Sequence, residues 1–266
     1  MRTVVVVQAR SGSTRLPRKV LLPLGGRSLL ERMLERLACA RAPDAIFVAT
    51  TTESDDDELA ALCARAGFPC YRGHPTDLLD RHYRVALEAR ADVIVKVPSD
   101  CPLIDPEVVD RVVLDHLGAP DRVDYTSNLH PETYPDGSDV EVMTVDALEV
   151  ACSEAVRKHE REHTTPFLWD QPERFVLRNV EWQTGRDVSR THRVVVDYAE
   201  DYEVVRAVFD ALWTPSRPVF SVAEVVAFLD AHSELRRMNA QRFGASWRVL
   251  QTVDLRTAGP HAKGHA

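Results

Sequence analysis

Apolar residues in the first half of the chain follow two alternating patterns. Short runs of apolar, mostly β-branched residues are typical of buried strands, and they occur at residues 4–7, 45–50, 68–71 and 93–97. The segments between them place apolar residues three or four positions apart, as amphipathic helices do. Such helices are predicted after Ser28 as an N-cap, at 59–66, at 77–89 and at 106–117. The alternation predicts an α/β fold, a Rossmann-like, mostly parallel sheet with helices on both faces.

The pattern changes from Val123 onward. Residues 131–137 are rich in Pro and Gly, and residues 138–145 alternate with a period of two, which predicts a β-rich insertion over about 123–192. Helices are predicted at 145–156, 160–169, 204–212 and 222–229, with another apolar strand at 193–197. We therefore expect one domain over residues 1–235 and a C-terminal extension over 236–266, with a flexible tail from Gln251.

The loop after the first predicted strand is the strongest candidate for a binding site. It turns through Gly12, and small residues on either side offer hydroxyl and backbone N–H groups. Four cations occur within ten residues: Arg10, Arg15, Arg18 and Lys19. N–H groups in a small-residue loop form an anion site, and guanidinium and ammonium groups neutralise a polyphosphate. In parallel sheets, ligands bind at the carboxyl ends of the strands, where this loop falls. A basic surface loop after an edge strand is the alternative interpretation.

Charge is distributed unevenly along the chain. The first thirty residues contain six cations and no acid, whereas the whole chain has a net charge of −8. The positive field is therefore concentrated at the loop, and the acidic balance elsewhere argues against a nucleic-acid-binding surface. The five cysteines have no paired spacing, the apolar run at 4–7 is too short for a signal peptide, and no segment approaches a membrane span. We expect a cytoplasmic protein.

Two aspartates follow apolar strands and are candidate ligands for Mg²⁺. Asp100 comes just after residues 93–97, and Asp197 ends residues 194–196. Mg²⁺ takes one or two carboxylates together with phosphate oxygens, so carboxylates beside a phosphate loop suit it. Asp100 could also be an ordinary turn residue, and Asp197 could cap the following helix. Asp105, before Pro106, is better explained as a helix cap.

Residues 159–163 formally match the zinc-protease pattern His-Glu-x-x-His. Zinc-protease helices bury the face that carries the two histidines, but charged residues make this stretch hydrophilic all round. Pro166 also ends the helix soon afterwards. The sequence therefore argues against a protease.

Three segments resemble motifs of the sugar-acid cytidylyltransferases, which activate 3-deoxy-manno-octulosonate and N-acylneuraminates with CTP. Residues 8–21 are similar to the nucleotide-binding loop of these enzymes, most of all in the branch of the spore coat polysaccharide biosynthesis protein F. Residues 97–106 resemble Gly-Asp-x-Pro-Leu-Ile-Asp-Pro, with Ser99 where glycine is frequent. Residues 196–201 resemble Val-Asp-Thr-Pro-Glu-Asp, but Tyr198 and Ala199 replace Thr-Pro, a difference with no evident functional meaning. The resemblance extends over about residues 2–230.

The resemblance implies a nucleotidyltransferase that joins CMP from CTP to an acidic or amino sugar and releases pyrophosphate. It implies that Asp100 and Asp197 hold Mg²⁺ and, with Arg10 and Lys19, form the catalytic set. The nucleotide-binding residues it implies are Ala9, Arg10, Ser11, Gly12, Ser13, Arg15, Lys19, Asp77, Arg81 and Ser99.

Further segments of the resemblance concern the base and the acceptor. Residues 72–81 are similar to a segment that lies near the nucleoside, where Arg81 could read cytosine or pair with Asp77 or Asp80 on its own helix. In an extended strand Asp139 and Glu141 would point to one face. There they could bind acceptor hydroxyls or support the metal site, or they could simply be solvated charges on the strand. The acceptor-binding residues that the resemblance implies are Asp139, Glu141, Arg161 and His163. The 123–192 insertion is expected to bind the acceptor or form a homodimer.

Two other functions remain open at this point. A glycosyltransferase that uses a nucleotide-sugar would favour an Asp-x-Asp pair, whereas Ser99-Asp100-Cys101 supplies one acid. A catalytically silent nucleotide-binding subunit is the second alternative, and the intact set of loop cations and aspartates argues against it.

Overall fold

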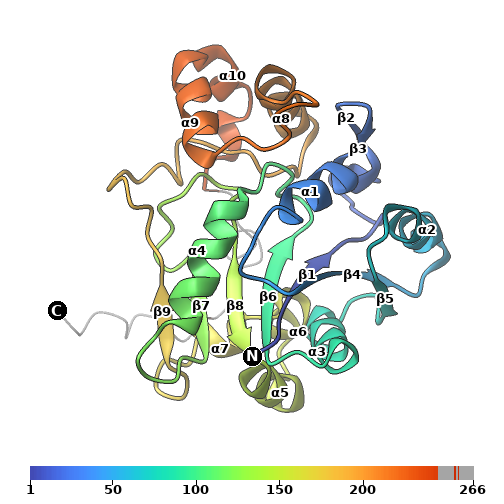
Figure 1. Cartoon of the computed structure of the whole chain (residues 1–266), viewed down its shortest axis with the longest axis vertical. Coiled ribbons are helices and arrows are strands. Elements are labelled where there is room, and N and C mark those ends of the chain that lie inside the picture. Colours follow the sequence, from blue (N-terminus) through green and yellow to red (C-terminus); the bar gives the residue numbers. More distant parts are fainter. Residues whose placement is uncertain (245–254, 256, 258–266) are drawn as a thin grey trace.

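The computed structural model describes residues 1–244, 255 and 257, and these residues form an α/β fold around one large sheet (Figure 1). Helices cover both faces of the sheet. The tail predicted from Gln251 lies outside the described residues, apart from positions 255 and 257.

The four apolar runs in the first half of the chain form the parallel centre of the sheet. They are β1 (Thr3–Gln8), β4 (Ala45–Thr51), β5 (Cys70–Gly73) and β6 (Val93–Pro98). Strand β1 pairs with β4 on one side and with β6 on the other, and β4 pairs with β5. Residues Val4 to Val7 are fully buried because helices cover both faces of β1. The strands predicted at 4–7, 45–50 and 93–97 are confirmed, whereas the one predicted at 68–71 lies two residues later, at Cys70–Gly73, and is mostly half-buried.

The second half of the chain extends the same sheet. Strands β7 (Tyr125–Ser127), β8 (Glu141–Thr144) and β9 (Leu177–Asn179) complete the order β5-β4-β1-β6-β8-β7-β9. Strand β8 runs antiparallel to β6 and β7, whereas β9 is parallel to β7. The predicted mostly parallel fold is therefore confirmed. A separate two-stranded hairpin joins β2 (Pro23–Leu24) to β3 (Arg27–Ser28).

Seven longer helices occur among the described residues, packed on the sheet or beyond its carboxyl end, and their ends follow local chemistry. Ser28 caps the first with a capping box, Gly67 ends the second at φ 79°, and Asp105 caps the fourth, as predicted. The helices are α1 (Leu29–Leu37), α2 (Asp57–Ala66), α3 (Leu78–Ala89), α4 (Pro106–Leu117), α5 (Val145–Glu154), α8 (Ala199–Leu212) and α9 (Val222–Ala231).

Several elements are shorter than these. The single helix predicted at 160–169 is wrong, because the chain forms α6 (Lys158–His163) and α7 (Pro166–Trp169), with Thr164 at φ 71° between them. Proline lacks an N–H donor, so Pro166 cannot continue α6 through a backbone hydrogen bond and instead takes the first position of α7, where such a donor is not needed. The remaining short elements are η1 (Lys19–Leu21), η2 (Ser54–Asp56), α10 (Ser233–Met238) and η3 (Ala240–Arg242).

The strand predicted at 193–197 is also wrong. This segment forms one isolated bridge, between Arg193 and Asp136, and belongs to no strand of the sheet. Its backbone instead bonds to two loops, since Val194 N–H donates to Asp136 O at 2.7 Å and Val196 N–H donates to Asp100 O at 2.8 Å. Val194 and Val196 are buried in the apolar cluster of α8 and α9 rather than in the sheet.

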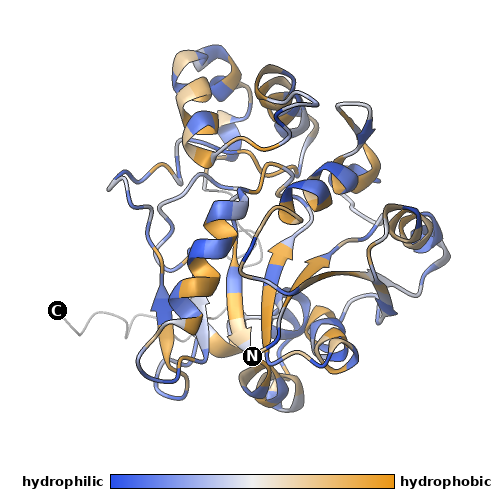
Figure 2. Ribbon diagram, viewed as in Figure 1, coloured by the Kyte–Doolittle hydropathy of each residue, from blue (hydrophilic) through white to orange (hydrophobic). Residues whose placement is uncertain are grey.

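The strands at the centre of the sheet are mostly hydrophobic (Figure 2), and their alternate residues belong to two different cores. Val5 and Val7 pack with α1, α2 and α4, whereas Val4 and Val6 pack with α3, α5 and α7. A third apolar cluster joins α8, α9 and the β2–β3 hairpin, and includes Phe209. Figure 1 shows α8, α9 and α10 beyond the carboxyl end of β6, beside the predicted site.

Candidate functional site

The loop after β1 is preformed by backbone bonds. Ala9 N–H donates to Ala49 O at 3.0 Å, which continues the pairing with β4 beyond the end of the strand. The carbonyl of Ser11 accepts from Ser13 at 2.9 Å and from Arg18 at 3.0 Å, so the loop folds back on itself. The side chains of Arg10 and Arg15 are exposed. The loop therefore presents cations at the carboxyl end of the sheet, where the sequence predicts a phosphate site.

Asp56 fixes this loop, and the sequence analysis missed it. Its carboxylate accepts from Ser11 N–H at 2.6 Å, from Thr51 N–H at 3.3 Å and from the Thr51 hydroxyl. Burial alone would raise the pKa of Asp56, but these hydrogen bonds outweigh burial and lower it. The only signal in the sequence is the acid-rich segment after the second strand, which lies beside the loop because β4 neighbours β1.

Lys19 connects the basic loop to the two predicted metal ligands. Its ammonium group donates to Asp100 Oδ2 at 2.9 Å, to Asp197 Oδ1 at 2.9 Å and to Val196 O at 2.8 Å. An ammonium group has three N–H donors, so these bonds use all of them. Burial would lower the pKa of Lys19, but the two carboxylates raise it overall. Burial would likewise raise the pKa of Asp100, and Lys19 lowers it.

Arg193 holds the other side of Asp197. This guanidinium is 1% exposed, and it donates to Asp197 Oδ2 at 3.3 Å, to Asp136 Oδ2 at 2.5 Å and to Asp201 Oδ1 at 2.9 Å. Asp201 also accepts from the N–H groups of Asp197 and Tyr198. Helix α8 therefore has Tyr198 as its N-cap, with Asp201 supplying the capping carboxylate, and Asp197 faces the site.

The turn at Asp136 approaches this segment closely. Gly137 has φ 109°, and a Cβ atom on it would lie 2.5 Å from Val195 N, so a glycine is required there. Burial raises the pKa of Asp136 to about 6 in spite of Arg193. Asp136, Arg193 and Asp201 are further site residues that the sequence analysis did not identify.

The carboxylates of Asp100 and Asp197 fit a divalent cation that arrives with a nucleotide. One oxygen of each lies 2.9 Å from the same ammonium nitrogen, so the two carboxylates converge on one cationic point. Over residues 1–244, 255 and 257, no group of three or more His, Cys, Asp or Glu side chains could hold a metal ion. Mg²⁺ needs only one or two carboxylates when phosphate oxygens and water complete its shell, so two aspartates suffice.

Arg81 is a buried cation with few bonds to the protein. It is 2% exposed; its Nη1 donates to Ala49 O at 3.4 Å, and its Nε has no partner among the described residues. Burial lowers its pKa to about 10, and the nearby charge of Arg10 contributes to the decrease. Neither acid on its own helix pairs with it, because Asp77 accepts from Arg161 Nε at 2.8 Å and Asp80 accepts from Arg84.

The predicted acceptor residues lie in different surroundings. Glu141 is buried in β8, where it pairs with Lys96 and accepts from the Tyr125 hydroxyl at 2.6 Å. Burial would raise the pKa of Glu141, but Lys96 lowers it to about 2. The sequence had suggested that Asp139 and Glu141 lie in one strand. Strand β8 begins only at Glu141, so Asp139 lies outside it. Burial and the negative charges of Asp136, Asp100 and other nearby acids raise the pKa of Asp139.

The remaining predicted residues are spread around the rim of the sheet. Ser99 is buried beside Asp100, and Gly12 and Ser13 lie at the accessible tip of the loop. Arg161 connects α6 to Asp77 at the N-terminus of α3, and His163 ends α6. The structure thus brings Lys19, Arg15, Asp100 and Asp197 together, while Arg161 and Asp77 form a second pair.

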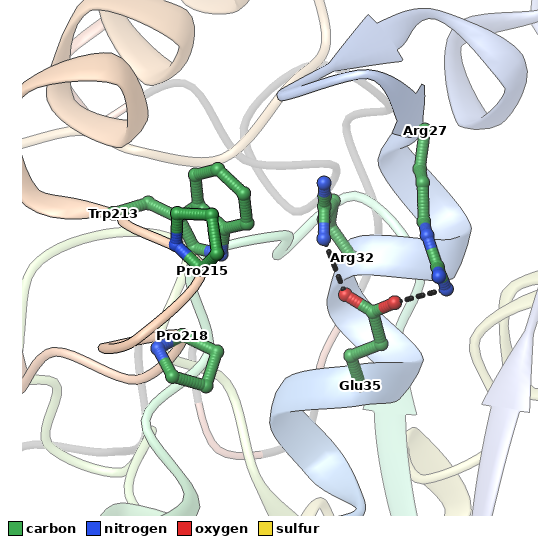
Figure 3. A pocket seen from close by; sticks show the side chains of 6 residues that line it. All are labelled: Arg27, Arg32, Glu35, Trp213, Pro215 and Pro218. Carbon is green, nitrogen blue, oxygen red and sulfur yellow. Dashed lines mark hydrogen bonds and ion pairs between the residues drawn. The ribbon is translucent and has the colours of Figure 1, made fainter.

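A hollow elsewhere on the surface contains none of these residues. It lies between α1 and the segment after α8, where Arg32 stacks at 4.3 Å from the Trp213 ring centroid (Figure 3). Arg27 and Arg32 are both paired with Glu35, so their charges are already neutralised.

Among the described residues, no helix is both long and apolar enough to cross a membrane.

We predict that Asp56→Asn lowers the free energy of unfolding by about 1–3 kcal/mol, because the loop loses a charged acceptor. The folded pKa of Asp56 lies below its unfolded value of about 3.9. Its contribution is therefore present above about pH 4 and is lost as the pH falls through the folded pKa. Urea unfolding from pH 3 to pH 8 would measure this. The exposed Asp57→Asn is the control, and a difference independent of pH would contradict the assignment.

We predict that Arg193→Met lowers the free energy of unfolding by about 3–5 kcal/mol, because it leaves buried carboxylates without their cation. Arg206→Met is the matched control, since Arg206 pairs with Glu203 on the exposed face of α8. The control should change stability by less than about 0.5 kcal/mol. Equal effects of the two substitutions in urea unfolding would show that the Arg193 network does not stabilise the fold.

Comparison with known proteins places the chain in a family. The family model described as "Cytidylyltransferase" matches residues 4–228. The spore coat polysaccharide biosynthesis protein SpsF of Bacillus subtilis is 30% identical, over 86% of this chain and 94% of that protein. The uncharacterized protein MJ1063 of Methanocaldococcus jannaschii is 33% identical, over 94% of this chain and 100% of that protein.

A solved structure agrees with these relatives. A cytidylyltransferase from Leptospira borgpetersenii is 31% identical and superimposes with a TM-score of 0.83, covering 88% of this chain and 96% of that chain. The resemblance stated from the loop and the two acidic segments is confirmed by the family match. The chain therefore belongs to the cytidylyltransferase family and is a CTP-dependent nucleotidyltransferase.

Proposed function

We propose that this protein transfers CMP from CTP to a sugar acid of the nonulosonic or octulosonic type, with release of pyrophosphate, in surface polysaccharide or glycoconjugate biosynthesis. The observation that carries the proposal is the convergence of Lys19, Asp100 and Asp197 beside a loop of exposed cations. Such a site offers cations to a triphosphate and carboxylates to its metal ion. The name of the spore coat relative supports a role in polysaccharide synthesis.

The proposed reaction is an in-line displacement at the α-phosphorus. The acceptor hydroxyl oxygen forms a bond to this phosphorus, the bond to the bridging oxygen of pyrophosphate breaks, and the hydroxyl proton passes to a base. No covalent intermediate with the protein is required. Arg10, Arg15 and Lys19 would neutralise the charge that develops on the leaving pyrophosphate, in positions that the folded loop sets before the substrate binds.

Asp100 and Asp197 would hold Mg²⁺, which when bound neutralises phosphate charge and orients the triphosphate. Because the two carboxylates and the Val196 carbonyl occupy all three donors of Lys19, we propose that the ammonium group turns to the phosphates when the metal and nucleotide bind. Arg193 would keep Asp197 in place during this exchange, since it binds the carboxylate oxygen that Lys19 does not contact.

The base and the acceptor would bind on either side of this centre. The buried guanidinium of Arg81 has an Nε–H with no partner among the residues that the structure describes, which supports a hydrogen bond to the acceptor edge of cytosine. A buried donor without a partner costs about 1–3 kcal/mol, and a bound base would remove this cost. We further propose a cytoplasmic homodimer, which the resemblance to the sugar-acid cytidylyltransferases implies.

Pyrophosphate release tests the proposal. The protein is incubated with Mg²⁺, each of the four nucleoside triphosphates and a panel of nonulosonic and octulosonic acids. We expect release with CTP and one class of acceptor, and loss of release when the metal is chelated. Asp100→Asn and Asp197→Asn should each lower kcat/KM by about 100-fold or more, because each removes a metal ligand. Asp210→Asn, on the exposed face of α8, is the control.

Other outcomes would assign a different function. Release of a nucleoside diphosphate from a nucleotide-sugar, with no use of CTP, would identify a glycosyltransferase. A rise in Tm with CTP and Mg²⁺ but no turnover with any acceptor would identify a nucleotide-binding subunit. Equal turnover with all four triphosphates would contradict the proposed role of Arg81.

A further inference from the structure

Two arginines from opposite ends of the chain lie against the same aromatic ring. The guanidinium carbon of Arg15, in the loop after β1, is 5.4 Å from the centroid of the Tyr198 ring. The guanidinium carbon of Arg242, in η3, is 3.7 Å from the same centroid. Both distances lie within the range of about 6 Å over which an aromatic ring attracts a cation. Arg242 lies beyond residues 4–228, the part of the chain that the family model matches.

Both guanidiniums keep most of their donors available. Arg15 Nη2 bonds to Asp197 at 2.5 Å, and Arg242 Nε bonds to Glu200 at 2.9 Å. Neither has another hydrogen bond or ion pair to the described residues. Each guanidinium carries five N–H donors in a planar fork, which suits phosphate oxygens. The side chains are 41% and 34% exposed, so a ligand can reach them.

The position of the pair identifies the ligand. Arg15 belongs to the cationic loop and forms an ion pair with Asp197, which also pairs with Lys19. Arg15 and Arg242 therefore border the site proposed for the triphosphate. The two guanidinium carbons lie no further apart than the sum of their distances to the ring, a span that one polyphosphate can bridge. Adjacent cations repel each other, and a shared anion removes this repulsion.

We propose that Arg242 joins Arg15 in binding the β- and γ-phosphates of CTP and the pyrophosphate product, and that Tyr198 positions both guanidiniums. The inference rests on the proposed function, because it extends the phosphate site of that reaction. It gives the C-terminal segment a direct part in substrate binding. It also gives a role to Tyr198, which stands where the similar motif of the family has threonine, a replacement that the sequence alone does not explain.

Isothermal titration with three ligands tests the inference. CTP, inorganic pyrophosphate and CMP are titrated, each with Mg²⁺, into the wild type, Arg242→Gln, Tyr198→Leu and the double variant. CMP lacks the β- and γ-phosphates. Arg242→Gln should weaken the binding of CTP and pyrophosphate about tenfold, as expected for the loss of a charge-assisted hydrogen bond, and leave CMP binding within about twofold. Tyr198→Leu should weaken the same two ligands. The double variant should be less affected than two independent effects predict.

Arg236→Gln is the matched control. Arg236 lies in α10, six residues before Arg242, is 35% exposed and also pairs with one acid, Asp230. It should bind all three ligands as the wild type does. Far-UV circular dichroism and Tm would confirm that each variant is folded.

Three results would overturn the inference. Arg242→Gln could bind CTP and pyrophosphate as tightly as the wild type, or it could weaken CMP equally, or it could raise the KM of the acceptor alone. The last result would place Arg242 at an anionic group of the acceptor instead. A wild type that binds none of the three ligands would overturn the proposed function itself. Binding without sugar-acid turnover would overturn only the assignment of the acceptor.

Discussion

The rest of the site depends on the buried ionic network around Asp197. One carboxylate oxygen of this residue meets Lys19 and Arg15, and the other meets Arg193. A buried charge without a partner costs several kcal/mol, so each of these contacts requires the others. The network connects segments that are far apart in the chain: the loop after β1, the end of β6, the Asp136 turn and the start of α8.

This network also explains why one surface can receive both a polyphosphate and a cation. The carboxylates lie deeper and are neutralised by Lys19 and Arg193, whereas Arg10 and Arg15 remain accessible. The cations follow β1 and Asp100 follows β6. Because these two strands are adjacent in the sheet, the opposite charges lie close enough to make contact. Asp56 adds rigidity, because it holds the loop by its backbone and leaves the cationic side chains to the ligand.

The proposed phosphate site extends beyond the part of the chain that carries the family pattern. Helix α10 packs against α8, and η3 follows it directly, so Arg242 returns to the loop near the N-terminus. Asn239, just before η3, donates to Arg193 O at 3.1 Å and to Asp201 Oδ1 at 3.0 Å, and this joins the C-terminal segment to the ionic network. Residues 239–242 are therefore part of the architecture of the site.

The sequence by itself determined the parallel centre of the sheet, most helices, the loop of cations and the two aspartates. These features depend on the spacing of apolar and charged residues over short stretches of the chain. It failed at residues 193–197, where burial against α8 and α9 resembles the pattern of a buried strand. Only the tertiary structure decided which charges meet. Ser11 and Asp56 are 45 residues apart, Asp136 and Arg193 are 57 apart, and Lys19 and Asp197 are 178 apart. The energy of such pairs depends on distance in space and on burial, and neither quantity can be read from the order of residues along the chain.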